Sequence, residues 1–229
     1  MRLCINRIFL LFLTFSLLFC GCQQAKAADE TFKEDPIASL TFLGDSITAH
    51  MASRAEVKPT QLWVSKERYL NLDSHITHAN IVAPDTGKEE RIAEVAARLK
   101  PRALVITLGI DYGVYYYRND LAVFAKYYEK LLEEILSASP ETKILLQSIF
   151  PVSASCKNLT NEMIDNANAV IREIAKKREL LYLDTQSVLR DEDGFLKKEY
   201  CYSEDGIHLT SAAYEAVLAY ISSQVQNEV

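Results

Sequence analysis

Short apolar runs, separated by longer amphipathic segments, recur along most of the chain. The run Ala103–Leu108 (ALVITL) is apolar throughout and rich in β-branched residues, which is typical of a strand buried on both faces of a parallel sheet. Four other runs have the length and character of strands. The five predicted strands are Ser39–Leu43, Ile76–Val82, Ala103–Leu108, Lys143–Ile149 and Leu180–Leu183.

Between these strands, apolar residues recur with helical spacing. Ile92, Val95 and Leu99 share one face of a predicted helix, which Pro101 ends. Three longer helices are predicted from the same kind of pattern, over residues 121–135, 164–174 and 210–225. Strands that alternate with helices predict a parallel sheet covered on both faces, whose functional loops follow the carboxyl ends of the strands.

The composition is that of an ordinary globular protein with one domain. Of the 229 residues, 49% are hydrophobic and 24% are charged, which excludes a disordered chain, a collagen and a coiled-coil rod. The chain has 25 basic and 31 acidic residues, a net charge of −6. We expect no nucleic-acid partner, because an acidic protein lacks the positive surface that binds phosphates.

The N-terminus has the pattern of an export signal. Arg2 and Arg7 accompany an apolar segment, Ile8–Cys20, that would span only about 20 Å as a helix, less than the ~30 Å hydrocarbon core of a membrane. Residues 1–21 are therefore predicted to be a signal peptide rather than a lasting membrane span. The predicted location is extracytoplasmic, at the surface of a bacterial cell.

Two cleavage sites compete after this signal. Gly21-Cys22 resembles a bacterial lipobox, in which Cys22 carries the lipid, and this interpretation is favoured. The segment 25–27 (AKA) instead fits an ordinary signal-peptidase site. Residues 22–37 are polar and are expected to be a tether to a domain of residues 38–229. Membrane contact is then expected only through a lipid anchor on Cys22.

Two short motifs carry candidate chemistry at opposite ends of the domain. Gly44–Ile47 (GDSI) follows the first predicted strand, where the Ser46 hydroxyl can be a nucleophile beside N–H groups that bind an oxyanion. Asp205 and His208 precede the last helix, and a spacing of three lets the carboxylate orient the imidazole. Each motif alone also fits a turn or a helix cap. Together they predict the nucleophile, base and orienting carboxylate of a serine hydrolase.

These motifs resemble the first and last blocks of the SGNH, or GDSL-like, hydrolase family, and the elements between them cover nearly the whole domain. The resemblance implies an α/β fold, a three-layer α/β/α sandwich around a five-stranded parallel sheet of flavodoxin-like order. It implies Ser46 as nucleophile, His208 as general base and Asp205 as its orienter, with the N–H of Ser46 as one oxyanion donor. No metal and no cofactor are expected.

The third block of that family is altered in this chain. The family has Gly-x-Asn-Asp, whose asparagine amide donates to the oxyanion, whereas Gly109–Tyr112 reads GIDY. An ionised carboxylate accepts hydrogen bonds but cannot donate one. Three explanations stay open: Asp111 is protonated and donates, Asn80 or a tyrosine hydroxyl donates instead, or the protein is a weak or inactive relative.

Aromatic residues are expected at the rim of the site. Trp63, Tyr112, Tyr115 and Tyr116 are candidates for a platform that binds a sugar face or an acyl chain. The same rings would equally fit packing between a loop and the core. His50, in contrast, is expected on the surface of a helix and outside the site.

Two cysteines are predicted to stabilise the same rim. Cys156 follows the fourth strand and Cys201 precedes Asp205, so that both loops should border the site. In an oxidising compartment these cysteines are expected to form a disulfide that pins the loop of Asp205 and His208.

The sequence thus predicts a serine esterase that forms an acyl-enzyme on Ser46. The expected substrate is a small acyl ester or an acylated glycan, for example an acetylated polysaccharide. The alternative is a surface glycan-binding protein with little or no catalysis on the same scaffold, which Asp111 favours. The sequence indicates neither the acyl group nor the oligomeric state.

Overall fold

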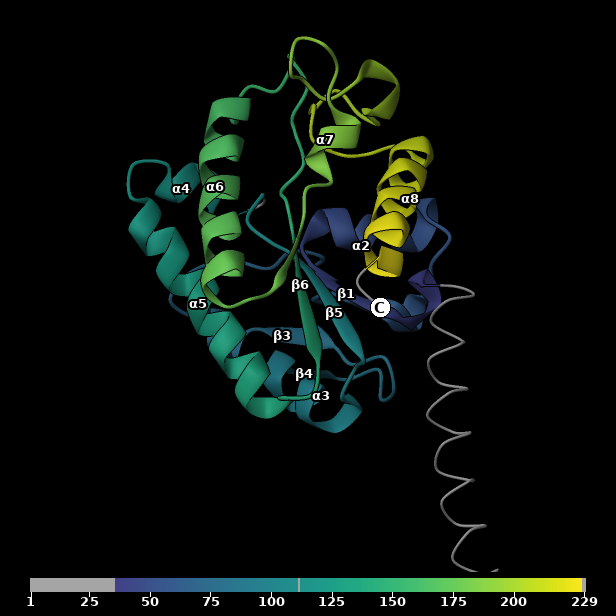
Figure 1. Cartoon of the computed structure of the whole chain (residues 1–229), viewed down its shortest axis with the longest axis vertical. Helices are drawn as coiled ribbons and strands as arrows, with labels where there is room; N and C mark the ends of the chain where they lie inside the picture. The colour runs from purple at the N-terminus through teal and green to yellow at the C-terminus, as the bar shows by residue number, and fades with distance from the viewer. Residues whose placement is uncertain (1–35, 111, 228–229) are drawn as a thin grey trace, which may run out of the picture.

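Five parallel strands form the centre of the computed structural model, which describes residues 36–110 and 112–227 (Figure 1). The strands are β1 (Leu40–Gly44), β2 (Leu62–Trp63), β5 (Ala103–Thr107), β6 (Lys143–Gln147) and β7 (Leu181–Leu183). Their order across the sheet is β2-β1-β5-β6-β7, and each neighbouring pair is parallel. Counted along the chain, this is the flavodoxin-like order 2-1-3-4-5, as predicted. The predicted signal peptide, Cys22 and Asp111 lie outside the described residues.

The middle of the sheet is buried on both faces. All five residues of β5 are buried, and they pair in register with β1, from Leu40 opposite Ala103 to Gly44 opposite Thr107. The carboxyl ends of β1 and β5 therefore lie side by side. The chain order reverses between these two strands, and this is the position where open parallel sheets place their binding crevice.

Helices cover both faces of the sheet and complete the three predicted layers. The helices are α2 (Ser46–Arg54), α3 (Ile92–Leu99), α4 (Val114–Tyr117), α5 (Leu121–Ala138), α6 (Asn161–Lys177), α7 (Gln186–Leu189) and α8 (Ser211–Asn227). Figure 1 shows α5 and α6 on one side of the sheet, and α2 and α8 on the other. α3 packs against α5. Each long helix lies where its apolar stripe predicted it, and α6 buries Ile164, Ala167 and Ile171 from its stripe.

The predicted strand Ile76–Val82 is wrong as a member of the central sheet. Ile76–His78 is a 3-10 turn, and β3 (Asn80–Val82) pairs antiparallel with β4 (Glu89–Arg91) in a separate hairpin. The strand beside β1 is instead β2. With only two residues, β2 is too short for a periodic pattern to reveal it in the sequence.

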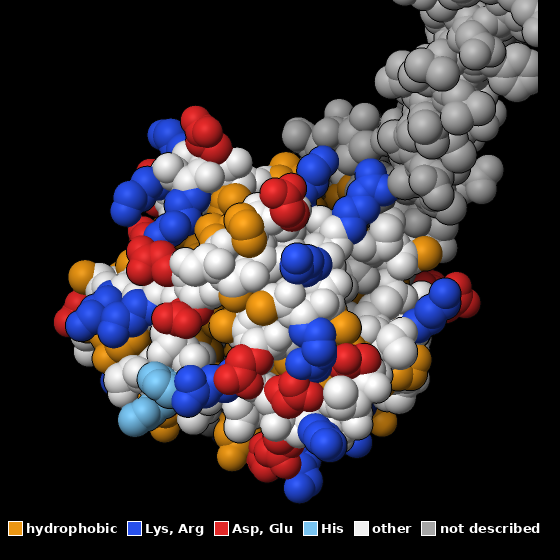
Figure 2. Space-filling model, turned by 90° about the horizontal axis from the view of Figure 1, so that it is seen from below, with side chains coloured by type: hydrophobic (Ala, Val, Ile, Leu, Met, Phe, Trp, Pro, Cys, Tyr) orange, Lys and Arg blue, Asp and Glu red, His pale blue; other side chains and the backbone are white. Residues whose placement is uncertain are grey.

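Charged side chains of both signs are interspersed at the end of the molecule that Figure 2 views. At the hairpin, Arg98 of α3 forms ion pairs with Asp85 and Glu90. The hydrogen bond from Arg98 lowers the pKa of Asp85, and bonds from Thr86 and Arg98 lower that of Glu90. These pairs fasten the hairpin to α3. Among the described residues, no helix combines the length and the apolar character needed to cross a membrane.

Candidate active site

The turn between β1 and α2 carries the predicted nucleophile. β1 ends at Gly44, Asp45 caps the helix, and Ser46 is the first residue of α2. A Cβ atom at position 44 would lie 2.0 Å from Oγ1 of Thr48 and 2.6 Å from the carbonyl oxygen of Thr107, so only glycine fits there. This close approach places the partly exposed Ser46 at the helix N-terminus, beside the carboxyl end of β5.

Asp45 joins this turn to the loop that follows β5. Its side chain is 1% exposed, and it accepts a hydrogen bond from the N–H of Ile47. Its Oδ2 atom also accepts from the N–H groups of Gly109 and Ile110, at 3.3 Å each. The carboxylate therefore fixes the GIDY loop relative to Ser46. This bridging role was not predicted, although Leu43 and Ile47, two positions away on either side of Asp45, are a sign of burial.

Asp205 and His208 form a hydrogen-bonded pair on the loop before α8. Oδ2 of Asp205 lies 2.7 Å from Nδ1 of His208, and Oδ1 accepts from the N–H groups of Ile207 and His208 at 2.8 and 3.2 Å. Burial alone would raise the pKa of Asp205, but these hydrogen bonds outweigh it and hold the pKa well below its usual value. Asp205 is therefore ionised at neutral pH and orients the imidazole.

The loop that carries His208, residues 201–210, packs against α2. We call it the base loop. The ring centroids of His208 and His50 are 4.5 Å apart. Arg54, one turn further along α2, donates to the carbonyl oxygen of Leu209 at 3.2 Å, and its guanidinium lies 3.5 Å from the centre of the Tyr202 ring. Two residues of α2 thus hold the base loop on both sides of His208.

This contact places His208 on the side of α2 that carries Ser46. Ser46 and His50 are four residues apart and therefore share one face of the helix. Nε2 of His208 is buried and has no hydrogen-bond partner among the described residues. A nitrogen that can accept a proton thus lies on the same side of α2 as the predicted nucleophile. His50, which was expected on the helix surface, is instead a neighbour of the predicted base.

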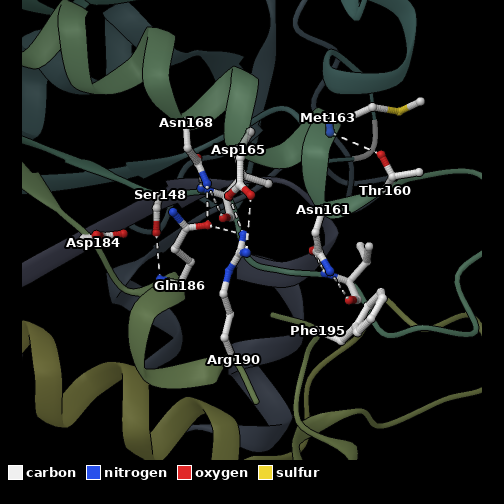
Figure 3. A network of polar contacts seen from close by, with 12 residues as sticks. Ser148, Thr160, Asn161, Met163, Asp165, Asn168, Asp184, Gln186, Arg190 and Phe195 are labelled. Atoms are coloured by element: carbon white, nitrogen blue, oxygen red, sulfur yellow. Dashed lines mark hydrogen bonds and ion pairs between the residues drawn. The ribbon is translucent and has the colours of Figure 1, made fainter. Parts of the chain in front are cut away.

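Two asparagines of α6 hold the segment that follows β6 (Figure 3). Asn168 accepts from the N–H of Ile149 at 2.7 Å and donates to its carbonyl oxygen at 2.9 Å. Asn161 makes the same two bonds with Val152, at 2.8 and 2.9 Å. The two asparagines are seven residues apart, so they project from one helix face. We call this pair of side chains the α6 clamp.

The α6 clamp is itself supported by α7. Oε1 of Gln186 accepts from Asn168 at 3.1 Å and from Arg190 at 2.9 Å (Figure 3). Arg190 also forms an ion pair with Asp165 of α6, and the N–H of Gln186 donates to Oγ of Ser148. Asn168 is therefore part of a connected polar network with Gln186, Arg190 and Asp165, while Asn161, among the described residues, bonds only to Val152.

The segment held by the clamp contacts the loop of the predicted base. The N–H of Ser153 donates to the carbonyl oxygen of Gly206 at 2.8 Å. Gly206 has a φ of 76°, and a Cβ atom there would lie 2.5 Å from Oγ of Ser153 and 3.0 Å from the nitrogen of Cys156. Glycine is therefore needed both for the backbone conformation and for the close approach. Through this contact, α6 helps to position the adjacent Asp205.

The predicted disulfide between Cys156 and Cys201 is wrong. Both residues are partly buried free thiols, and Sγ of Cys201 donates to the carbonyl oxygen of Ser203 at 3.1 Å. Cys156 does border the base loop at Gly206, as expected. The two loops are joined there by backbone hydrogen bonding, while the thiol of Cys201 turns into its own loop.

The aromatic candidates divide into one buried ring and an exposed cluster. Trp63 is 1% exposed within β2, so it packs in the core and its predicted place at the rim is wrong. Tyr115 and Tyr116 are 43% and 56% exposed. The ring of Tyr112 stacks on that of Tyr116 with 3.9 Å between centroids, and Tyr115 meets Tyr116 edge-on at 5.7 Å. This tyrosine cluster begins with the last residue of the GIDY loop and continues into α4.

The structure does not connect Asn80 with this arrangement. Asn80 is exposed at the start of β3, opposite Arg91 of the hairpin, and its side chain makes no hydrogen bond to any described residue. Asp111 lies outside the described residues, so its part in the site stays a prediction. Within residues 36–110 and 112–227, no three His, Cys, Asp or Glu side chains are grouped so that they could hold a metal ion.

Solved structures of low sequence identity share this fold. A candidate acylhydrolase from Bacteroides fragilis matches with a TM-score of 0.57 and 16% identity, over 82% of this chain and 86% of that one. A candidate platelet activating factor from Streptococcus pneumonia matches with a TM-score of 0.55 and 17% identity, over 96% of this chain and 100% of that one. A carbohydrate esterase family 3 protein from Talaromyces cellulolyticus matches with a TM-score of 0.51 and 16% identity, over 83% of this chain and 98% of that one. At these identities the likeness concerns the fold.

Sequence comparison identifies the family. No curated protein sequence matches the chain significantly. The model of the GDSL-like Lipase/Acylhydrolase family matches residues 42–216. The match begins within β1, ends within α8, and includes Ser46, Asp205 and His208. Because it covers most of the 229 residues, the chain belongs to the GDSL-like lipase/acylhydrolase family.

Proposed function

We propose that this GDSL-like hydrolase is an extracytoplasmic serine esterase, with Ser46 as nucleophile, His208 as general base and Asp205 as its orienting carboxylate. One observation carries the proposal. The hydrogen-bonded Asp205–His208 pair packs against the helix that begins at Ser46, on the face that Ser46 shares. A nucleophile, a base and an orienting carboxylate perform acyl transfer on several unrelated folds.

The proposed reaction has two halves. In the first, Nε2 of His208 takes the proton of Ser46 as Oγ attacks the ester carbonyl carbon, and the proton then passes to the departing alcohol. The acyl group stays on Oγ as an ester. In the second, water loses a proton to His208 and attacks the carbonyl carbon of the acyl-enzyme. The bond to Oγ then breaks, His208 returns the proton to Oγ of Ser46, and the carboxylic acid is released. Asp205, whose pKa is lowered, supplies the negative charge that stabilises the imidazolium.

The N-terminus of α2 is the proposed site of oxyanion stabilisation. The nine-residue helix begins at Ser46, and its N–H groups and dipole favour negative charge at this end. We propose the N–H of Ser46 as one donor. Asp45 holds the GIDY loop beside the same helix end, where that loop can close one side of the oxyanion site.

The proposed substrate is an acylated glycan that carries an acetyl or another short acyl ester. The exposed rings of Tyr115 and Tyr116, directly after the GIDY loop, offer the aromatic surface that sugar faces pack on. The fold shared with the Talaromyces cellulolyticus carbohydrate esterase supports this choice. A signal peptide over residues 1–21 and a lipid on Cys22 would place the enzyme at the bacterial surface, next to such polymers.

The test compares two serines of the same helix. Wild-type protein should hydrolyse p-nitrophenyl acetate and be labelled on Ser46 by a serine-directed phosphonate. Ser46→Ala should lose both activities. Ser53→Ala, on the exposed part of α2, should keep both. Hydrolysis that persists in Ser46→Ala, or phosphonate attached to another residue, would overturn the assignment.

A glycan-binding protein without catalysis is the second candidate, and the observation that favours it is Asp111 in place of the family asparagine. Asp111→Asn tests this point. Restoring an amide donor is expected to raise esterase turnover by about 10²–10³-fold, the usual value of one oxyanion donor. An unchanged or lower rate would show that Asp111 does not limit the reaction. Glycan binding without turnover in either form would favour the binding protein.

A further inference from the structure

Beside the proposed base, two residues of α2 form a polar pair that the reaction itself does not use. Nη1 of Arg54 lies 3.3 Å from Nδ1 of His50. A guanidinium stays protonated and can only donate, so Nδ1 of His50 must be the acceptor. The proton of the neutral ring then lies on Nε2. The contact thus selects one tautomer of His50 and opposes a second proton on its ring.

Arg54 is held firmly enough to keep this contact. It donates to the carbonyl oxygen of Leu209 at 3.2 Å, and its guanidinium lies over the ring of Tyr202. The N–H of Tyr202 in turn donates to the carbonyl oxygen of His208 at 2.7 Å. Arg54 and His50 are therefore held in fixed positions relative to the base loop.

The contact between the two imidazoles means that a positive charge on one ring affects a positive charge on the other. The centroids of His50 and His208 are 4.5 Å apart, and two like charges at such a distance oppose one another. Among the described residues, Arg54 of α2 contacts His50, and Asp205 contacts His208. Tyr202 lies against Arg54. Asp205 favours a positive charge on His208, whereas Arg54 disfavours one on His50. The two imidazoles therefore differ in how well each can carry a positive charge.

We propose that His50 is a positioning residue for the base, and that Arg54 keeps it neutral so that the proton from Ser46 goes to His208 alone. The proposal rests on the proposed function, because it assumes that His208 must become positively charged during the reaction. A protonated His50 would raise the energy of that state. A neutral His50 supports the ring of His208 without competing for the proton.

The first experiment is independent of activity. The chain has four histidines, so ¹⁵N-histidine NMR of the whole protein can follow each ring, with His50→Gln and His208→Gln used for assignment. We expect His50 as the neutral Nε2–H tautomer at pH 7. In Arg54→Met, His50 should lose this tautomer preference and take up a proton more readily. Equal spectra for His50 in wild type and Arg54→Met would overturn the proposal.

The second experiment measures the rate of p-nitrophenyl acetate hydrolysis against pH. Arg54→Met should move the acid limb of kcat to higher pH by about one unit, so that activity at pH 6 falls about tenfold more than activity at pH 8. Arg54→Lys keeps the positive charge and should keep the acid limb. Arg91→Met, at an exposed position of β4, controls for the loss of one arginine.

A double variant separates the proposal from simple loss of packing. In a His50→Gln background, Arg54→Met should no longer move the acid limb, because the competing imidazole is absent. A uniform loss of rate at every pH, or a shift that persists without His50, would overturn the proposal. Wild-type protein that shows the NMR behaviour but no reaction at Ser46 would instead contradict the proposed function.

Discussion

Asp205 accepts three hydrogen bonds, two from N–H groups of its own loop and one from the ring of His208. These bonds lower its pKa below the ordinary 3.8 despite its burial. A carboxylate with a lowered pKa stabilises the fold above its unfolded pKa, and this contribution is lost as the pH falls through the folded value. The orientation of the proposed base is therefore expected to survive mild acid and to be lost only below about pH 4.

Replacing Asp205 by asparagine tests this orienting role. Asp205→Asn keeps the size of the side chain but removes its charge, and its amide no longer favours the N–H on Nδ1 of His208. We expect kcat for p-nitrophenyl acetate to fall about 10³–10⁴-fold, with little change in KM. Asp191→Asn, on an exposed turn, serves as the control. Near-normal turnover in Asp205→Asn would show that another group orients the base.

At the residue scale, the sequence predicted local contacts better than contacts between distant residues. Asp205 and His208 pair as expected because a spacing of three brings them together locally. The contact of His50 with His208 joins residues that are far apart in the chain, and no local pattern encodes it. The burial of Trp63 was missed for the same reason, since it depends on what covers β2.

At the scale of elements, the α6 clamp determines where the chain goes after β6. Asn168 is 1% exposed and satisfies both backbone groups of Ile149. Asn168→Ala would leave these groups buried without partners, which costs about 1–3 kcal/mol for each group. We expect the urea midpoint of unfolding to fall accordingly. Asn166→Ala, at an exposed position of the same helix, should change it little. Equal stability of the two variants would contradict a structural role for the clamp.

The length of an element decided whether the sequence revealed it. β5 and β6 were predicted close to their observed bounds because each is five residues long and contains a continuous apolar run. The long helices were predicted for the same reason. β2, with two residues, is defined only by its pairing with β1. The run around Ile81 has strand character but pairs locally with β4, because a hairpin partner lies within ten residues.

At the scale of the whole molecule, ion pairs join the two long helices on one face of the sheet. Glu129 of α5 contacts Lys177 and Arg178 of α6, and Arg178 also contacts Glu133. Hydrogen bonds from Arg178 and Lys177 lower the pKa of Glu129 below 4.5. This contribution to stability is present above about pH 4.5 and is lost as the pH falls further.

Glu129→Gln should therefore be less stable than wild type at pH 7, by about 0.5–1 kcal/mol. The difference should shrink as the pH is lowered from 5 towards 2, because wild type then loses the same ion pairs. Urea unfolding at several pH values measures this. Glu134→Gln, exposed on the same helix, should follow the wild-type pH dependence. A difference between Glu129→Gln and wild type that is constant with pH would contradict the assignment.

The bond from Arg54 to Leu209 joins residues that are 155 positions apart. During synthesis, the serine turn emerges early and the base loop only when the domain is almost finished. Under the proposed mechanism, a partly made chain holds the Ser46 hydroxyl without its base. Hydrolysis is then expected to begin only once α8 has docked, where Tyr214 donates to the carbonyl of Ile47. The proposed mechanism thus predicts that activity starts only when the last helix is in place, and that a nascent polypeptide leaves the esters around it intact.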